Sequence, residues 1–183
     1  GEAAVKRSFT ALRQVLGDAS ILVNSAGIST FSTVLEMTTE QWDEMIRVNL
    51  RSMFLCSREV LPAMLERRWG RIINVSSTIA HNGGELQSHY AASKSGVLGL
   101  TRALAREVAR EGITVNALCP GGVDTPMTRG FPKEWYEEYF AEQPLGRFAH
   151  VDEIAPTAVL LASDAGAYYT GVSMNMNGGD VMV

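Results

Sequence analysis

The sequence has 183 residues, enough for one domain, residues 1–183, with a single sizeable core. Its 46% hydrophobic and 20% charged residues argue against disorder, collagen and coiled coil. The net charge of −4 offers no basic field for nucleic acid or an anionic membrane, and no run of 18 apolar residues indicates a membrane span. We therefore expect no nucleic-acid partner and no membrane partner.

The first elements are predicted to be a helix and a strand. Residues 2–16 carry apolar side chains at helical spacing, and Gly17 follows as a stop. Residues 20–24 form a short apolar run typical of a parallel strand covered on both faces. The small residues of Asn24-Ser-Ala-Gly27 follow this strand and allow a ligand to approach the backbone.

A long apolar stripe comes next. Thr38-Thr-Glu-Gln41 predicts a capping box at which a helix begins. Apolar side chains at helical spacing continue from there to Gly70, and Pro62 is predicted to bend the helix. Asn49 interrupts this stripe. A polar amide at this inward-facing position either satisfies a neighbouring backbone group or serves a site, and both interpretations stay open.

The strongest chemical signal lies after the next strand. Residues 71–76 are rich in β-branched side chains, so Ser77 is expected at a strand's carboxyl end, where open α/β sheets bind ligands. A helix is predicted from about 88 to 111, with Tyr90 and Lys94 one turn apart on one face. An ammonium group at that distance lowers the pKa of a phenol, which makes Tyr90 a usable general acid or base.

The rest of the 88–111 helix and the following strand complete this unit. Arg102, Arg106 and Arg110 form a row of cations, interpreted as a solvated face or a subunit contact. Residues 113–118 predict a strand. The turn that follows it, Cys119-Pro-Gly-Gly-Val-Asp-Thr125, has the dihedral freedom to wrap closely around a ligand.

Large rings dominate residues 126–148, with a short helix expected over 133–142. They either pack a core or line an apolar substrate site. A helix over 151–162 and a strand over 172–176 close the chain. Cys56 and Cys119 are expected to be buried free thiols, which fits a cytoplasmic location, and the scattered histidines give no metal-ligand spacing, so we expect no metal site.

Strands that alternate with helices predict an α/β fold with a doubly wound, parallel, Rossmann-like sheet. Six signposts then stand in order along the chain: Asn24-Ser-Ala-Gly27, Val48-Asn49, Ser77, Tyr90-x3-Lys94, Pro120-Gly121 and Asn177-Gly-Gly179. In identity and spacing this series resembles the short-chain dehydrogenase/reductase family, and most of all its 3-oxoacyl carrier-protein reductases. The family's glycine-rich phosphate loop belongs upstream of Gly1. The resemblance therefore implies an N-terminally truncated domain, and we expect this chain alone to be poorly soluble or inactive.

The resemblance also implies a site. It makes Ser77 the group that holds the substrate oxygen, Tyr90 the proton donor or acceptor, Lys94 the group that tunes Tyr90 and binds ribose, and Asn49 the holder of a relay water. The positions it assigns to cofactor binding, in addition to Tyr90 and Lys94, are Asn24, Ala26, Gly27, Pro120, Gly121, Val123 and Thr125.

The reaction implied is hydride transfer between NADP or NAD and a carbonyl or secondary alcohol, with an acyl thioester as a candidate substrate, by a homodimer or homotetramer. Two alternatives stay open. One is a sugar or polyol dehydrogenase of the same family. The other is a truncated, non-catalytic paralogue that serves as an oligomerisation or binding module through its apolar helices.

Overall fold

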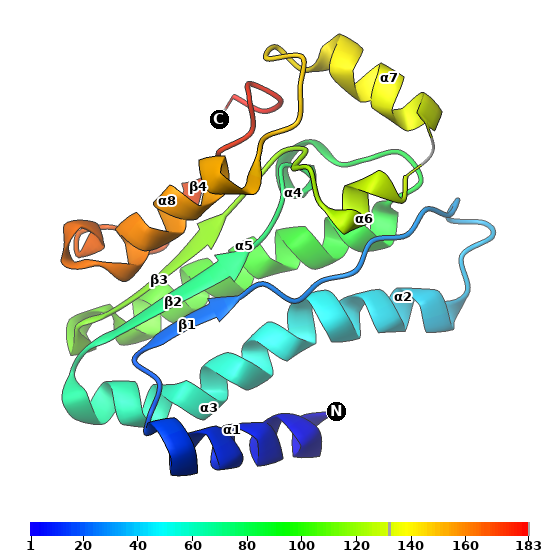
Figure 1. The fold of residues 1–183 in the computed structure, drawn as a ribbon. Helices are drawn as coiled ribbons and strands as arrows, with labels where there is room; N and C mark the ends of the chain where they lie inside the picture. The colour runs from blue at the N-terminus through cyan, green and yellow to red at the C-terminus, as the bar shows by residue number, and fades with distance from the viewer. Residues whose placement is uncertain (132, 183) are drawn as a thin grey trace.

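The computed structural model describes residues 1–131 and 133–182, and it has an α/β fold (Figure 1). Four strands form one parallel sheet in the order β1-β2-β3-β4. They are β1 (Ile21–Asn24), β2 (Gly70–Val75), β3 (Ile113–Leu118) and β4 (Ser173–Met174). All four expected strands are present. The last is shorter than the predicted 172–176, because only two of its residues pair in regular register with β3.

Eight α-helices are described, and the expected helices are all among them. The helices are α1 (Glu2–Leu16), α2 (Thr39–Ile46), α3 (Ser52–Arg67), α4 (Ile79–Asn82), α5 (Ser88–Val108), α6 (Pro126–Arg129), α7 (Lys133–Glu142) and α8 (Val151–Ala162). A π-helical turn (Arg47–Arg51) joins α2 to α3, and short 3₁₀ turns follow α5 (Ala109–Glu111) and α8 (Asp164–Gly166). Not one of the described helices has the length and apolarity needed to cross a membrane.

Helices cover both faces of the sheet, as a doubly wound fold requires. Successive strand residues point to opposite faces, so Ile72 and Ile73 of β2 enter different core clusters. Ile72 packs among side chains of α3 and α5, while Ile73 packs against Leu161 of α8. The predicted parallel, doubly wound, Rossmann-like architecture is confirmed.

Local sequence signals explain where the helices begin and end. Thr38 caps α2, because its hydroxyl accepts a hydrogen bond from the Gln41 amide while the Gln41 side chain accepts one from the Thr38 amide. Gly112, with φ of 74°, ends the 3₁₀ turn after α5. Pro62 lies inside α3, which stays helical around it.

The free edge of β1 is open. Among the described residues, β2 is the only strand that pairs with β1, and the β1 side chains Ile21 and Val23 remain exposed. Helix α1 lies beside α3 (Figure 1) and contributes Phe9 to the core, while Val15 and Leu16 are exposed. That the chain alone is poorly soluble or inactive stays a prediction.

Candidate active site

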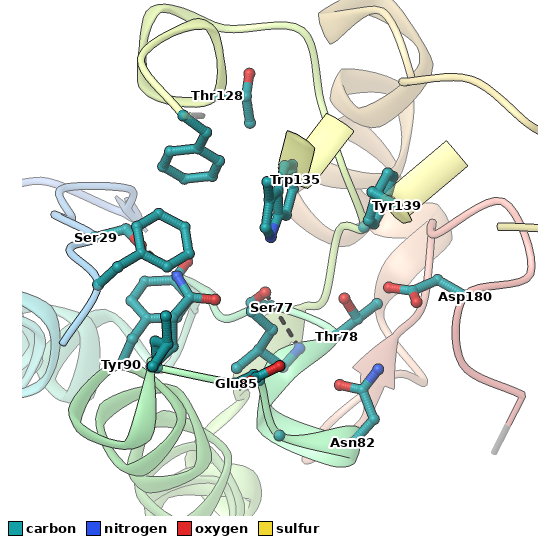
Figure 2. A pocket seen from close by; sticks show the side chains of 18 of the residues that line it. Ser29, Ser77, Thr78, Asn82, Glu85, Tyr90, Thr128, Trp135, Tyr139 and Asp180 are labelled. Carbon is teal, nitrogen blue, oxygen red and sulfur yellow. Dashed lines mark hydrogen bonds between the residues drawn. The ribbon is translucent and has the colours of Figure 1, made fainter. Parts of the chain in front are cut away.

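A cavity of about 480 Å³ lies beyond the carboxyl ends of β2 and β3 (Figure 2). Because all strands run in the same direction, the segments that follow them meet at this edge of the sheet. The cavity walls come from the loop after β1, the segment between β2 and α5, the turn after β3, and α6 with α7. Among the residues that line it are Ser29, Ser77, Tyr90, Gly121, Trp135 and Tyr139.

Ser77 and Tyr90 face each other across part of this cavity. Ser77 follows the last residue of β2 by two positions, and its Oγ accepts a hydrogen bond from the Ile79 amide at 3.3 Å (Figure 2). Tyr90 lies in the first turn of α5. Burial raises the pKa of Tyr90, and a hydrogen bond with the Ser77 side chain partly offsets that rise. The two hydroxyl groups therefore lie close enough to act on one substrate atom.

Lys94 lies one helical turn beyond Tyr90, as the spacing predicts. Its side chain is only 4% exposed, its Nζ donates a hydrogen bond to the Val75 carbonyl at 2.8 Å, and Nζ lies 5.6 Å from the centre of the Tyr90 ring. Burial lowers the pKa of Lys94 from 10.5 to about 8. The cation is thus costly to hold in the folded protein, which is typical of a functional group.

One expected effect of Lys94 is not found. The predicted lowering of the pKa of Tyr90 by the ammonium group is wrong for this structure, because burial raises it and Ser77 is the group that opposes the rise. The physical reason is direction: the Lys94 ammonium points to the Val75 carbonyl. Lys94 lies against the ring of Tyr90, whereas the side chain that acts on the phenol oxygen is Ser77.

Asn49 lies in the π-helical turn between α2 and α3 and is completely buried. Its Oδ1 accepts a hydrogen bond from the Ile28 amide at 2.8 Å, and its Nδ2 donates to the Ile28 carbonyl at 2.9 Å. Nδ2 also lies 3.2 Å from the Ser93 hydroxyl, on the α5 turn that carries Lys94. The structural interpretation of Asn49 is therefore supported, and its placement of a relay water stays a prediction.

Replacing Asn49 with Leu should lower the free energy of unfolding by about 2–4 kcal/mol, because both backbone groups of Ile28 lose their partner in a buried place. Urea unfolding followed by circular dichroism measures this difference. Asn82→Leu, at an exposed position of α4, is the control and should change stability little. A loss below about 1 kcal/mol in Asn49→Leu would contradict the assignment.

The residues after β1 divide into two groups. The Asn24 side chain is buried and donates hydrogen bonds to Asn74 at 2.8 Å and, more weakly, to Ser57 at 3.4 Å, so it joins β1 to β2 and α3. Ala26 is exposed. At Gly27, an added Cβ would lie 3.5 Å from Asn49 Oδ1 and 3.6 Å from Lys94 Nζ, which places this glycine beside both groups.

The turn after β3 approaches the site through its backbone. A Cβ at Gly121 would lie 2.9 Å from the Asn177 carbonyl oxygen and 3.0 Å from the Tyr139 hydroxyl, so no larger residue fits without displacement. In the described part of the chain, no acceptor takes a hydrogen bond from the Val123 amide. Pro120 is half-buried, and Thr125 caps α6, where its hydroxyl accepts from the Thr128 amide.

The aromatic side chains of residues 126–148 fit both interpretations left open by the sequence, since some line the cavity and others pack a core. Phe131, Trp135 and Tyr139 line the cavity, whereas Tyr136, Phe140 and Phe148 pack behind them. Tyr139 and Trp135 are stacked, with ring centres 5.1 Å apart. The Tyr139 hydroxyl also accepts a hydrogen bond from the Gly122 amide at 2.5 Å. This bond connects the aromatic wall of the cavity to the turn after β3.

Several cavity residues have no signal in the sequence. Ser29 and Phe31 come from the loop after β1, and Gln87 comes from the start of α5. Only the tertiary fold brings these two loops together. Among the described residues, no group of three His, Cys, Asp or Glu side chains is arranged to hold a metal ion, and both cysteines are free.

Comparison with known proteins agrees with this geometry. A family model described as enoyl-(acyl carrier protein) reductase matches residues 1–180. A 3-oxoacyl-[acyl-carrier-protein] reductase of Pseudomonas aeruginosa is 42% identical over 179 residues, 98% of this chain and 72% of that protein. Proteins of the same name from Escherichia coli (40% identical, 99% of this chain and 74% of that protein) and Thermotoga maritima (40%, 97% and 72%) are similar.

The matches therefore agree with the order of motifs and with the parallel fold. The chain belongs to the short-chain dehydrogenase/reductase family, as an NAD(P)-dependent oxidoreductase similar to the 3-oxoacyl carrier-protein reductases.

Proposed function

We propose that the protein reduces the 3-oxo group of acyl thioesters, with NADPH or NADH as the hydride donor. The observation that carries this proposal is that the hydroxyl groups of Ser77 and Tyr90 line the same cavity and interact, since the Ser77 side chain opposes the rise that burial causes in the pKa of Tyr90. A carbonyl oxygen between them would accept one hydrogen bond from each group. The names of the similar proteins support the choice of 3-oxoacyl thioesters.

Each of the four site residues would have a separate role in the reduction. Bound nicotinamide supplies a hydride to the carbonyl carbon, and the protein provides orientation and the proton. Ser77 holds the substrate oxygen, and Tyr90 donates its phenolic proton to that oxygen, which completes the alcohol. Lys94, buried beside the Tyr90 ring with its ammonium group on the Val75 carbonyl, would bind the ribose hydroxyls of the cofactor. Asn49 holds the loop after β1 in place against this group.

The chain has features that fit a nicotinamide cofactor. The Val123 amide, with no acceptor in the described residues, suits a carboxamide oxygen, and the absence of side chains at Gly27 and Gly121 leaves room near Lys94 and the cavity. We assign contacts with the cofactor to these groups, to Tyr90, and to the neighbouring Asn24, Ala26, Pro120 and Thr125. Asn24 and Thr125 would act mainly by shaping the backbone, since their side chains already have partners.

The cavity lining favours an uncharged acyl chain. One wall of the cavity is aromatic. The carboxylates that line it are Glu85, Glu142 and Asp180, and no Lys or Arg occurs among the described lining residues. Burial raises the pKa of Tyr139, and the charge of Asp180 adds a smaller rise, so this carboxylate acts on the site through space. A negatively charged substrate tail would meet three like charges there. An acyl chain fits better than a carboxylated or phosphorylated ketone.

A substrate comparison tests the proposal. With NADPH and NADH in turn, the purified protein should reduce a 3-oxoacyl thioester with kcat/KM at least about 10²-fold above that for the matching 2-enoyl thioester, which has no oxygen for Ser77 and Tyr90 to hold at that carbon. A ketone of equal length with a terminal carboxylate should be a poorer substrate. Faster turnover of a polyol with oxidised cofactor would favour the sugar or polyol alternative. Binding of neither cofactor would favour the non-catalytic module.

Assembly and location belong to the same proposal. Large apolar side chains are exposed on several helices, with Phe54 of α3 45% and Val159 of α8 67% exposed, and contacts between copies of the chain would cover them. We therefore propose a homo-oligomer, a dimer or tetramer. A cytoplasmic location is consistent with the two free thiols.

A further inference from the structure

Two loops of the cavity wall are fastened together by consecutive hydrogen bonds. The Gln87 side chain donates to the Ser29 hydroxyl at 2.8 Å, and the Thr30 hydroxyl and His89 Nε2 are 2.8 Å apart. The Ser32 amide donates to the Leu86 carbonyl at 2.8 Å. We call these three pairs the clasp. It joins residues 29–32, after β1, to residues 86–89, directly before Tyr90.

Both segments joined by the clasp, the start of α5 and the loop after β1, are held in place by their surroundings. On the α5 side, Gln87 and His89 are almost completely buried, and Leu86 has φ of 58°, a left-handed conformation that costs energy for a residue with a branched side chain. On the other side, Asn49 holds both backbone groups of Ile28, the residue just before the clasp. A strained residue at a cavity wall persists only when its surroundings enforce it. Here the bond from Ser32 to the Leu86 carbonyl does so.

The clasp carries two groups into the cavity at fixed positions. One is Tyr90, next to His89 in α5. The other is Phe31, between the clasp residues Thr30 and Ser32; its ring meets Phe131 edge to face, with centres 5.0 Å apart. Both rings line the cavity. Figure 2 shows Ser29 and Tyr90 on the same side of it.

We propose that the clasp is a positioning device for the reaction and that Phe31, which it holds, determines specificity for the acyl chain. Thr30 and His89 are positioning residues, since they act through Tyr90 and Phe31 and touch no reacting atom. The spacing between the proton donor and the aromatic wall is then set by hydrogen bonds between two loops. This inference rests on the proposed reduction of acyl thioesters.

Substitutions at Thr30 test the positioning role. Thr30→Val keeps the shape of the side chain and removes the bond to His89, so kcat should fall about three- to tenfold while KM for the cofactor stays the same. Thr30→Ser keeps the hydroxyl and should restore most of the rate. Thr33→Val, in the same loop, removes only two local hydrogen bonds with Glu36 and should leave kcat unchanged. Equal kcat in all three variants, or an equal loss in Thr33→Val, would overturn the positioning role.

Hydrogen exchange gives a readout that needs no activity. The amide of Ser32 should exchange faster in Thr30→Val than in Thr30→Ser or Thr33→Val. Loss of the Thr30–His89 hydrogen bond should let the two loops separate more often and so open the bond from Ser32 to the Leu86 carbonyl. Unchanged exchange of this amide would show that the three bonds do not act together, and would refute the clasp. Since this measurement uses the protein without substrate, its outcome does not depend on the proposed function.

Substitution of Phe31 tests the specificity role. Phe31→Ala removes one aromatic wall, so kcat/KM for a long 3-oxoacyl thioester should fall relative to a short one by about tenfold or more. The control is Tyr168→Ala, which removes a fully exposed ring outside the cavity lining and should leave this ratio unchanged. An unchanged ratio in Phe31→Ala would refute this role. If the wild-type protein reduces no thioester at all, the proposed function fails, and the exchange experiment still decides on the clasp.

Discussion

Tyr90→Phe should lower kcat for carbonyl reduction by about 10²–10⁴-fold, while the Kd of the nicotinamide cofactor changes little. The substitution removes one oxygen atom, and with it the proton that the substrate oxygen needs. The ring remains to fill its place beside Lys94. Steady-state kinetics with a 3-oxoacyl thioester measure the loss, and cofactor fluorescence measures binding.

Tyr168→Phe is the matched control for this experiment, because Tyr168 is completely exposed and does not line the cavity. It should keep normal kinetics. If Tyr90→Phe instead retains kcat within about threefold of the wild type, Tyr90 is not the proton donor, and the assignment of the whole site fails.

Lys94→Met should have two opposite effects: loss of activity and gain of stability. The folded protein lowers the pKa of Lys94 from 10.5 to about 8, since its ammonium group is almost fully buried. That shift corresponds to a cost of about 3 kcal/mol at neutral pH, the order of magnitude by which a well-packed Met could raise the free energy of unfolding. Without the amine that would hold the cofactor ribose in place, kcat should fall by about 10²-fold or more.

The pKa of Lys94 in the folded protein determines how the stability gain of Lys94→Met should change with pH. Below about pH 8 the amine is protonated in both the folded and the unfolded protein, so the cost of burying the charge is fully present. As the pH rises from about 8 to 10.5 the folded protein has already lost the proton, and the cost disappears. The advantage of Lys94→Met should therefore be largest at pH 7 and shrink towards pH 10.5. Urea unfolding at several pH values tests this, and an advantage that grows with pH would contradict it.

The sequence alone determined the alternation of helices and strands, and thereby the parallel sheet, because apolar periodicity and capping residues are local signals. Thr38 with Gln41 began a helix as predicted, and Gly112 ended one. The spacing of Tyr90 and Lys94 also fixed their common face on α5, since helical geometry repeats every 3.6 residues.

Only the tertiary structure decided how these groups are oriented and what surrounds them. The direction of the Lys94 ammonium depends on the Val75 carbonyl of another strand, so the expected effect on Tyr90 was not predictable from spacing. Asn49 meets Ile28, and Thr30 meets His89, across loops far apart in sequence. Contacts of this kind arise when parallel strands bring their carboxyl ends to one edge, and no local pattern encodes which side chains then meet.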